Sequence, residues 1–215
     1  MTGEGVTGLG VDARPGVDQD GTLIKRCLAG DSEAFRPLVQ RHQRVTFSVA
    51  YRMLGSRADA EDATQQGFVD AYVALARFQG DGRPNAFSSW LLRIVVNRCK
   101  DVLKSKKRTE SSLEPEMGVS EAAFSHQPRD PEAVLSDSNE RRALEKALQT
   151  LPLKYREVLV LKDVEDLPYE EIREVLHLPI TTLKIRVVRA RAMMREALEG
   201  MNPGGDTGRN TGTKP

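Results

Sequence analysis

The stretch YEEIREVLHLPITTLKIRVVRARAMMREAL, residues 169–198, decides how the chain is expected to fold. Apolar residues recur at helical spacing on both sides of a short break at 177–179, which predicts two helices joined by a tight turn. The second of these helices carries five Lys or Arg residues over 181–195 and no acid. This outline predicts a helix-turn-helix, in which the second helix lies in the major groove of DNA.

The second helix of this stretch has one apolar face, formed at positions i, i+4, i+7 and i+11 by Leu183, Val187, Ala190 and Met194. This face is expected to pack inward, so the opposite face presents hydroxyls and cations that suit base edges and phosphates. Ile185 and Val188 also lie on that open face, where they indicate contact with thymine methyl groups or with a protein. A basic surface helix that contacts only water is the competing interpretation, but the preceding helix and the short turn favour DNA binding.

Helical spacing extends through two segments, about 19–108 and about 139–199, and neither alternates apolar and polar residues as a strand would. The expected fold class is therefore all-α, with two small helical domains. Between them, 109–138 contains three prolines and many acids but a single Arg, so we expect a flexible acidic linker. The two ends, 1–18 and 200–215, are rich in Gly and are expected to be disordered.

Within the first segment, turn-forming and capping residues mark where helices should begin and end. Asp31 and Ser32 are expected to cap a helix that ends at Gly55 in a left-handed turn. Ser56 then offers a cap for the next helix, and a further helix is expected over about 87–104. In the second segment a first helix is expected over about 140–148.

The overall charge favours no class of binding partner, because 32 Lys and Arg against 31 Asp and Glu give a net charge of +1 over 215 residues. A preference for nucleic acid must then come from charges gathered on particular helices. No apolar run approaches the length of a membrane span and no leader is recognised, so a cytoplasmic protein without membrane insertion is expected. Cys27 and Cys99 form no CxxC pair, which argues against a disulfide framework or a zinc site.

A second group of cations lies close to aromatic residues in the first segment, as single-stranded nucleic acid requires for its phosphates and its unpaired bases. The cations are Arg93, Arg98, Lys100, Lys104, Lys106, Lys107 and Arg108. Trp90 shares a helical stripe with Ile94 and Asn97, so we interpret it as a core residue in preference to a stacking platform. The loop from Phe78 to Asn85 is the better candidate for holding a base.

Polar and acidic side chains share one face of the helix expected after Ser56: Asp59, Glu61, Asp62, Gln65, Gln66 and Asp70. The three histidines show no metal-ligand spacing relative to these carboxylates, so neither catalysis nor a metal or cofactor site is expected. A surface that contacts a basic protein partner, or simply water, explains the face better.

Several motifs in this order and spacing resemble those of bacterial RNA polymerase sigma factors of the sigma-70 family, in the extracytoplasmic-function group. In the first segment these are DAEDATQQGF at 59–68 and FSSWLLRIVVNRCKD at 87–101. In the second they are LPLKYREV at 151–158, LPYEEI at 167–172 and PITTLKIRVVRAR at 179–191. The resemblance covers about residues 19–199 and implies a non-enzymatic subunit that directs RNA polymerase to promoters and helps to open them.

The resemblance assigns a role to each of the three surfaces. The acidic face would bind core RNA polymerase through Asp59, Glu61, Asp62, Gln65, Gln66 and Asp70. The basic, aromatic helix would melt the minus-ten element and hold its single strand through Phe78, Gln79, Asn85, Phe87, Trp90, Arg93, Asn97, Arg98, Lys100 and Lys104. The helix-turn-helix would read the duplex minus-thirty-five element through Thr181, Thr182, Lys184, Ile185, Arg186, Arg189 and Arg191. The implied partners are core RNA polymerase, promoter DNA and an anti-sigma factor.

Four positions depart from the family pattern: Gln66 replaces a usual Glu, Ser88 a usual Arg, His177 a common Gly and Ile185 a usual Ser. His177 is expected to require a strained or altered backbone at the turn. A helix-turn-helix regulator with an N-terminal helical sensing domain is the alternative function. It explains the second segment but gives no purpose to the basic helix near Trp90 or to the acidic linker.

Overall fold

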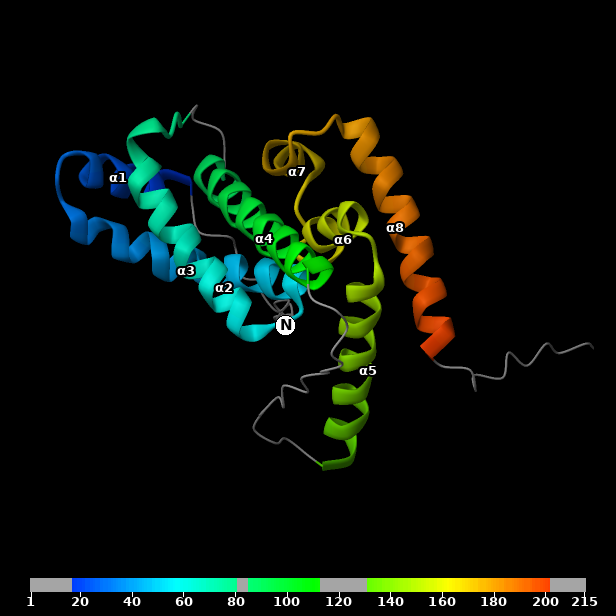
Figure 1. Ribbon diagram of the computed structural model, residues 1–215. Helices are drawn as coiled ribbons and strands as arrows, with labels where there is room; N and C mark the ends of the chain where they lie inside the picture. The colour runs from blue at the N-terminus through cyan, green and yellow to red at the C-terminus, as the bar shows by residue number, and fades with distance from the viewer. Residues whose placement is uncertain (1–16, 81–84, 113–130, 202–215) are drawn as a thin grey trace, which may run out of the picture.

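The computed structural model describes residues 17–80, 85–112 and 131–201, and within these ranges the chain is helical, without a strand. The α-helices are α1 (Val17–Leu28), α2 (Phe35–Leu54), α3 (Arg57–Ala74), α4 (Ala86–Ser112), α5 (Pro131–Thr150), α6 (Leu153–Leu159), α7 (Tyr169–Leu176) and α8 (Ile180–Met201). Short 3-10 turns, η1 (Ser32–Ala34) and η2 (Leu75–Arg77), precede α2 and follow α3, and a π-helical segment, η3 (Val160–Val164), follows α6. The all-α prediction is confirmed (Figure 1).

Helix ends in the first segment follow the local sequence. Gly55 ends α2 with φ +70°, and its amide donates to the carbonyl of Tyr51 at 2.8 Å. The Ser56 hydroxyl then accepts from the Asp59 amide at 3.4 Å and caps α3. At the start of α2 the structure differs, because a 3-10 turn intervenes and the Asp31 carboxylate bonds to Arg26 instead of capping.

The first four helices enclose an apolar core in which aromatic rings and leucines from α2, α3 and α4 interlock. A smaller cluster includes Ile24 of α1, Leu38 of α2 and Leu91 of α4. Close approach of α3 and α4 depends on Gly67, where an added methyl group would lie only 2.7 Å from Cγ2 of Val95. The core thus fixes the faces that α3 and α4 turn to solvent.

A larger cluster continues from α2, α3 and α4 into α5, α6, α7 and α8, so the two segments share one apolar core. Buried Arg156 of α6 adds a polar tie, since its Nη1 donates to the Met53 carbonyl of α2 at 2.6 Å. The side-chain amide of Gln149 donates to the Arg52 carbonyl at 2.8 Å. In Figure 1, α4 lies between the first helices and the pair α6 and α7. The sequence predicted the two helical segments but not this shared core.

The expected linker and tails lie largely outside the described residues, namely at 1–16, 113–130 and 202–215. Where the structure does describe their edges, it shows helix: α4 extends to Ser112, and α5 begins at Pro131 instead of near residue 140. Helix α1 likewise begins at Val17. Among the described helices, none combines the length and the apolar character that crossing a bilayer requires.

Candidate nucleic-acid interface

Helices α7 and α8 form the helix-turn-helix expected from the sequence. His177 ends α7 in the left-handed conformation, with φ 52° and ψ 45°, and its amide donates to the Arg173 carbonyl at 2.8 Å. A residue with a side chain pays a steric cost there that glycine avoids, so the expected altered backbone is present at this turn. Ile172 of α7 packs into the core with Leu183 and Val187 of α8, which fixes the rotation of α8.

The outward face of α8 carries most of the residues expected to read duplex DNA. Thr181, Lys184, Ile185 and Arg189 are exposed and Thr182 is half-buried. Arg189 bonds to the hydroxyl of Tyr155, and Lys184 Nζ lies 5.8 Å from the ring centroid of Tyr169. Arg186 and Arg191 instead pair with carboxylates within the chain. Arg186 Nη1 lies 3.3 Å from the Glu157 carboxylate, and Arg191 holds Asp163 through two bonds of 2.6 and 2.8 Å.

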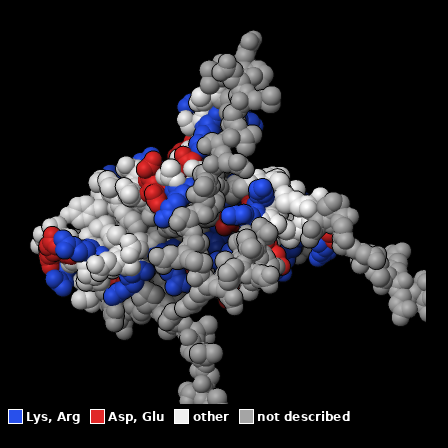
Figure 2. All heavy atoms as spheres, turned by 90° about the horizontal axis from the view of Figure 1, so that it is seen from below, with Lys and Arg blue, Asp and Glu red and all other residues white. Residues whose placement is uncertain are grey.

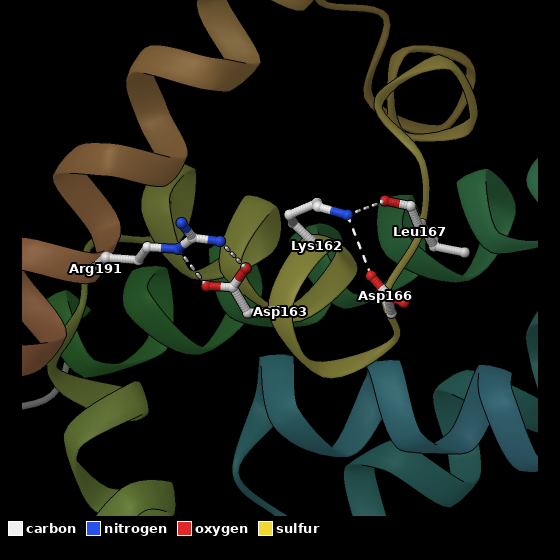
Figure 3. Close-up of polar contacts among 5 residues, drawn as sticks. All are labelled: Lys162, Asp163, Asp166, Leu167 and Arg191. Carbon is white, nitrogen blue, oxygen red and sulfur yellow. Dashed lines mark hydrogen bonds and ion pairs between the residues drawn. The ribbon is translucent and has the colours of Figure 1, made fainter. Parts of the chain in front are cut away.

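The pair of Arg191 and Asp163 belongs to a polar cluster at the π-helical segment (Figure 3). In that segment the Glu165 amide donates to the Val160 carbonyl, five residues back, at 3.0 Å. Lys162 Nζ then donates to the Leu167 carbonyl and to Asp166, each at 3.2 Å. These contacts tie η3 to α8 on one side and to the residues just before α7 on the other. They position the recognition helix relative to α6.

An aromatic cluster marks the surface expected to hold single-stranded DNA. Ring centroids of Phe78 and Trp90 lie 5.1 Å apart, and Phe87 lies 5.7 Å from Phe78 and 5.8 Å from Trp90. Phe87 is only 3% exposed, so it supports the other two rings from beneath and does not itself face solvent. Trp90 is half-buried: it packs against the core but also lines the adjoining cavity, so it is not solely the core residue that the sequence favoured.

A cavity of about 580 Å³ opens beside these rings, between the beginning of α4 and α7. It is lined by Arg77, Phe78, Gln79, Ala86, Ser89, Trp90, Arg93, Pro168, Glu170, Glu171 and Glu174. The acids of α7 were not anticipated at this surface, because no local spacing relates them to residues so far away in sequence. Asn85 is one of the expected DNA contacts, and its side-chain amide donates to Glu171 at 2.9 Å.

The basic face of α4 is partly open and partly paired. Arg93, Asn97 and Lys104 are exposed, although Lys104 Nζ lies 3.6 Å from the exposed carboxylate of Asp101. Lys100 instead lies 2.7 Å from the Glu157 carboxylate of α6, and Arg98 forms bonds of 2.7 and 3.2 Å with Asp70. Arg98 therefore braces α4 against α3, whereas the exposed residues leave a polar stripe along α4.

The polar face of α3 is arranged around three exposed side chains, Asp62, Gln65 and Gln66. The other three expected residues have partners: Asp59 pairs with Lys106, Glu61 with Arg57, and Asp70 with Arg98. The hydrogen bond from Arg98 lowers the pKa of Asp70, and Gln66 adds to this by donating at 3.0 Å. Burial raises the pKa of Asp59, but the bonds from Lys106 and Ser56 outweigh it and lower the value overall. These carboxylates stay ionised at neutral pH.

Charges of the two signs are interleaved on the face of the molecule that Figure 2 shows. In Figure 2 the Lys and Arg side chains form several separate groups, many of them beside Asp or Glu. In the part of the chain that the structure describes, no three His, Cys, Asp or Glu side chains come together as a metal site would require.

Taken together, an exposed recognition helix, a basic helix beside an aromatic cavity and an acidic helix face define an all-helical protein that binds DNA in transcription. Comparison with protein families identifies Sigma-70 region 2 at residues 38–109 and Sigma-70 region 4 at residues 141–194. The chain belongs to the sigma-70 family, within its extracytoplasmic-function group. It is a sigma factor that directs transcription initiation.

Curated relatives match over nearly their whole length. The ECF RNA polymerase sigma factor SigW of Bacillus subtilis is 33% identical over 186 residues, which cover 83% of this chain and 96% of the relative. The ECF RNA polymerase sigma-E factor of Escherichia coli is 33% identical over 177 residues, covering 80% and 90%. The alternative of a regulator with a sensing domain has no comparable support, because the first segment matches region 2.

Among solved structures, CnrH in complex with the cytosolic domain of CnrY matches with a TM-score of 0.63 and 27% identity. The match covers 85% of this chain and 99% of CnrH. The sigma factor RpoE of Bartonella quintana, in complex with the anti-sigma factor NepR, shares the fold with a TM-score of 0.60 at 21% identity over 77% of this chain and 96% of that one.

Proposed function

We propose that this sigma factor divides its work among three surfaces: α3 binds core RNA polymerase, η2 and α4 open and hold the minus-ten element, and α8 reads the minus-thirty-five element. The observation that carries the proposal is the outward rotation of α8. Its apolar residues Leu183, Val187 and Ala190 are buried, so its hydroxyls and cations project to solvent. In this proposal the protein acts by binding and not by catalysis, and it is located in the cytoplasm.

Binding of the minus-ten strand rests on the cavity beside Phe78 and Trp90. Extruding a base from the stack costs a few kcal/mol of free energy. Stacking of the base on an aromatic ring and the charge of nearby cations can offset this cost. Arg93 is exposed at the rim and supplies the counter-charge. In the structure described here, Asn85 and Lys100 contact Glu171 and Glu157, so these contacts must separate before both residues reach DNA.

On α8 the two kinds of cation have different tasks. Lys184 and Arg189 are exposed and contact phosphates in our proposal. Arg191 is bonded twice to Asp163 and Arg186 lies beside Glu157, so both first of all orient the helix. An arginine held in this way can still present a remaining N–H group to DNA, since the guanidinium has five donors.

Binding to core polymerase rests on the exposed group of Asp62, Gln65 and Gln66. An anti-sigma factor is a further partner in this proposal. Support comes from CnrH, whose structure contains the cytosolic domain of CnrY and whose fold is similar over 85% of this chain. Such a partner would regulate the factor by covering the surfaces that polymerase needs.

The α8 assignment is tested by the salt dependence of promoter binding with reconstituted holoenzyme. Lys184→Ala and Arg189→Ala are each expected to weaken binding and to lower the slope of log affinity against log salt by about one, the effect of one lost phosphate contact. Lys25→Ala, which removes an exposed cation from α1, is the matched control and should leave the slope unchanged. Unchanged slopes in both α8 variants would remove these residues from the DNA.

The polymerase surface is tested separately by charge reversal. Asp62→Lys is expected to reduce the affinity of the chain for core polymerase by about tenfold or more, because an unfavourable charge enters the interface. Glu33→Lys makes the same change at an exposed site on η1 and serves as the control. Equal affinities for the two variants would count against the α3 surface.

A further inference from the structure

Two apolar side chains project from the recognition helix into solvent. Ile185 is 54% exposed and Val188 is 67% exposed, although both belong to α8, whose opposite side is buried in the core. Leu183 and Val187 on that buried side leave no freedom for α8 to turn the exposed pair inward. Their exposure is therefore a fixed property of the folded chain. We expect the partner that α8 binds to offer an apolar group to these two side chains.

The surroundings of the pair suit DNA more than protein. Thr181 lies one turn before Ile185, and Lys184 and Arg189 flank the pair with positive charge. No acid occurs in the sequence from 181 to 195. A face that is cationic and hydroxylic around a small apolar centre matches the major groove, where phosphates surround base edges.

Within the major groove, the C5-methyl group of thymine is the apolar feature among the base-edge groups. Ile and Val are branched at Cβ and hold few rotamers in a helix, so they present a methyl-sized surface with little loss of conformational freedom. The Cβ atoms of side chains three residues apart on a helix are about 5–6 Å apart, roughly 2 Å more than the ~3.4 Å rise between base pairs, a difference that the length of an Ile side chain can span. The two side chains can therefore reach neighbouring base pairs.

We propose that Ile185 and Val188 select thymine at two neighbouring base pairs of the minus-thirty-five element by contacting their C5-methyl groups. This inference rests on the proposed role of α8 and adds to it the identity of the bases that are read. The hydroxyls and cations of α8 then position the helix, whereas these two apolar side chains discriminate between sequences.

The test uses holoenzyme, reconstituted with core polymerase of the same organism, and a promoter library randomised across the minus-thirty-five region. The wild-type chain should enrich sites with thymine at two neighbouring positions. Ile185→Ser and Val188→Ser should each lose the preference at one of them. Ile185→Val, which retains a branched apolar side chain, is the matched control and should keep it.

The enriched site is then synthesised with deoxyuridine in place of each selected thymine, which removes only the methyl group. Wild-type affinity should fall by about fourfold per methyl, and the matching Ser variant should lose that sensitivity. Equal affinity for the two DNAs would overturn the inference. Reduced affinity of the Ser variants for core polymerase, without any methyl effect, would likewise overturn it and assign the pair to a protein contact. Failure of the proposed function would look different, since no library sequence would then be enriched.

Discussion

The carboxylate of Glu157 lies 2.7 Å from the ammonium group of Lys100 and joins the second segment of the chain to the first. Glu157 belongs to α6 and is only 4% exposed, whereas Lys100 belongs to the basic helix α4. The other carboxylate oxygen of Glu157 lies 3.3 Å from Nη1 of Arg186 in the recognition helix. One buried carboxylate thus contacts a cation from each proposed DNA-binding helix.

Glu157→Gln should lower the free energy of unfolding by about 2 kcal/mol, because it leaves two partly buried cations without their counter-charge. Chemical denaturation of the full chain measures this loss. Glu196→Gln on the exposed side of α8 is the control and is expected to stay within about 0.5 kcal/mol of the wild type. A Glu157→Gln chain as stable as the control would show that the Lys100 pair contributes nothing to the fold.

Gly67→Ala should destabilise the chain by about 1–3 kcal/mol, since the new methyl group would meet Val95 at 2.7 Å and force α3 away from α4. Thermal unfolding followed by circular dichroism measures the effect. Gly21→Ala is a matched change in α1 with nothing within 4 Å of the added atom. It should stabilise the chain by about 0.5–1 kcal/mol through helix propensity, so opposite signs are expected for the two glycines.

Much of this fold could be predicted from local sequence. Gly55 and Ser56 carry the turn and the cap in their own residue types, and the periodic placement of Leu183 and Val187 predicts which side of α8 is buried. The pairing of Lys100 with Glu157 had no such signal, because it depends on how two segments pack across the chain.

In the candidate site, too, local features could be predicted from the sequence and contacts between distant segments could not. The sequence places Trp90 and Phe78 together with cations, and the structure brings both rings to one cavity. That Glu171 of α7 lines the same cavity could not be read from the sequence, since the contact is set by tertiary packing. Nor could the sequence show that Arg191 pairs with the Asp163 carboxylate whereas Arg189 on the same helix bonds to the Tyr155 hydroxyl.

Asp20 gives the fold a predictable acid sensitivity. Burial raises the pKa of this carboxyl, but hydrogen bonds and charges from His42 and Arg41 outweigh burial and hold the pKa below its ordinary value of 3.8. The unfolded chain therefore binds the proton more readily, so the stabilisation is present above pH 3.8 and is lost as the pH falls through the lower folded value.

Asp20→Asn should accordingly cost about 2 kcal/mol at neutral pH and remove this part of the acid dependence. Urea unfolding at several pH values between neutrality and acid measures both effects. If the variant and the wild type lost stability in parallel as the pH fell below 3.8, the assignment to Asp20 would be wrong.

His177→Gly should stabilise the chain by about 1 kcal/mol, because His177 adopts φ 52° and glycine enters this conformation without a steric cost. Gly55→Ala tests the same principle in reverse, with φ +70° and an added methyl 2.8 Å from the Gln149 side chain, and should destabilise. Melting temperatures of the two variants provide the comparison. A lower melting temperature for His177→Gly would mean that the imidazole itself stabilises the turn.

The most direct test of the whole account is transcription by core RNA polymerase with and without the purified chain, on genomic DNA fragments from the same organism, with transcript start sites mapped. We expect discrete starts that appear only when the chain is present, preceded at fixed spacing by a shared pair of upstream elements. Transcripts whose positions and yields do not change on adding the chain, under low salt where holoenzyme should form, would contradict the assignment.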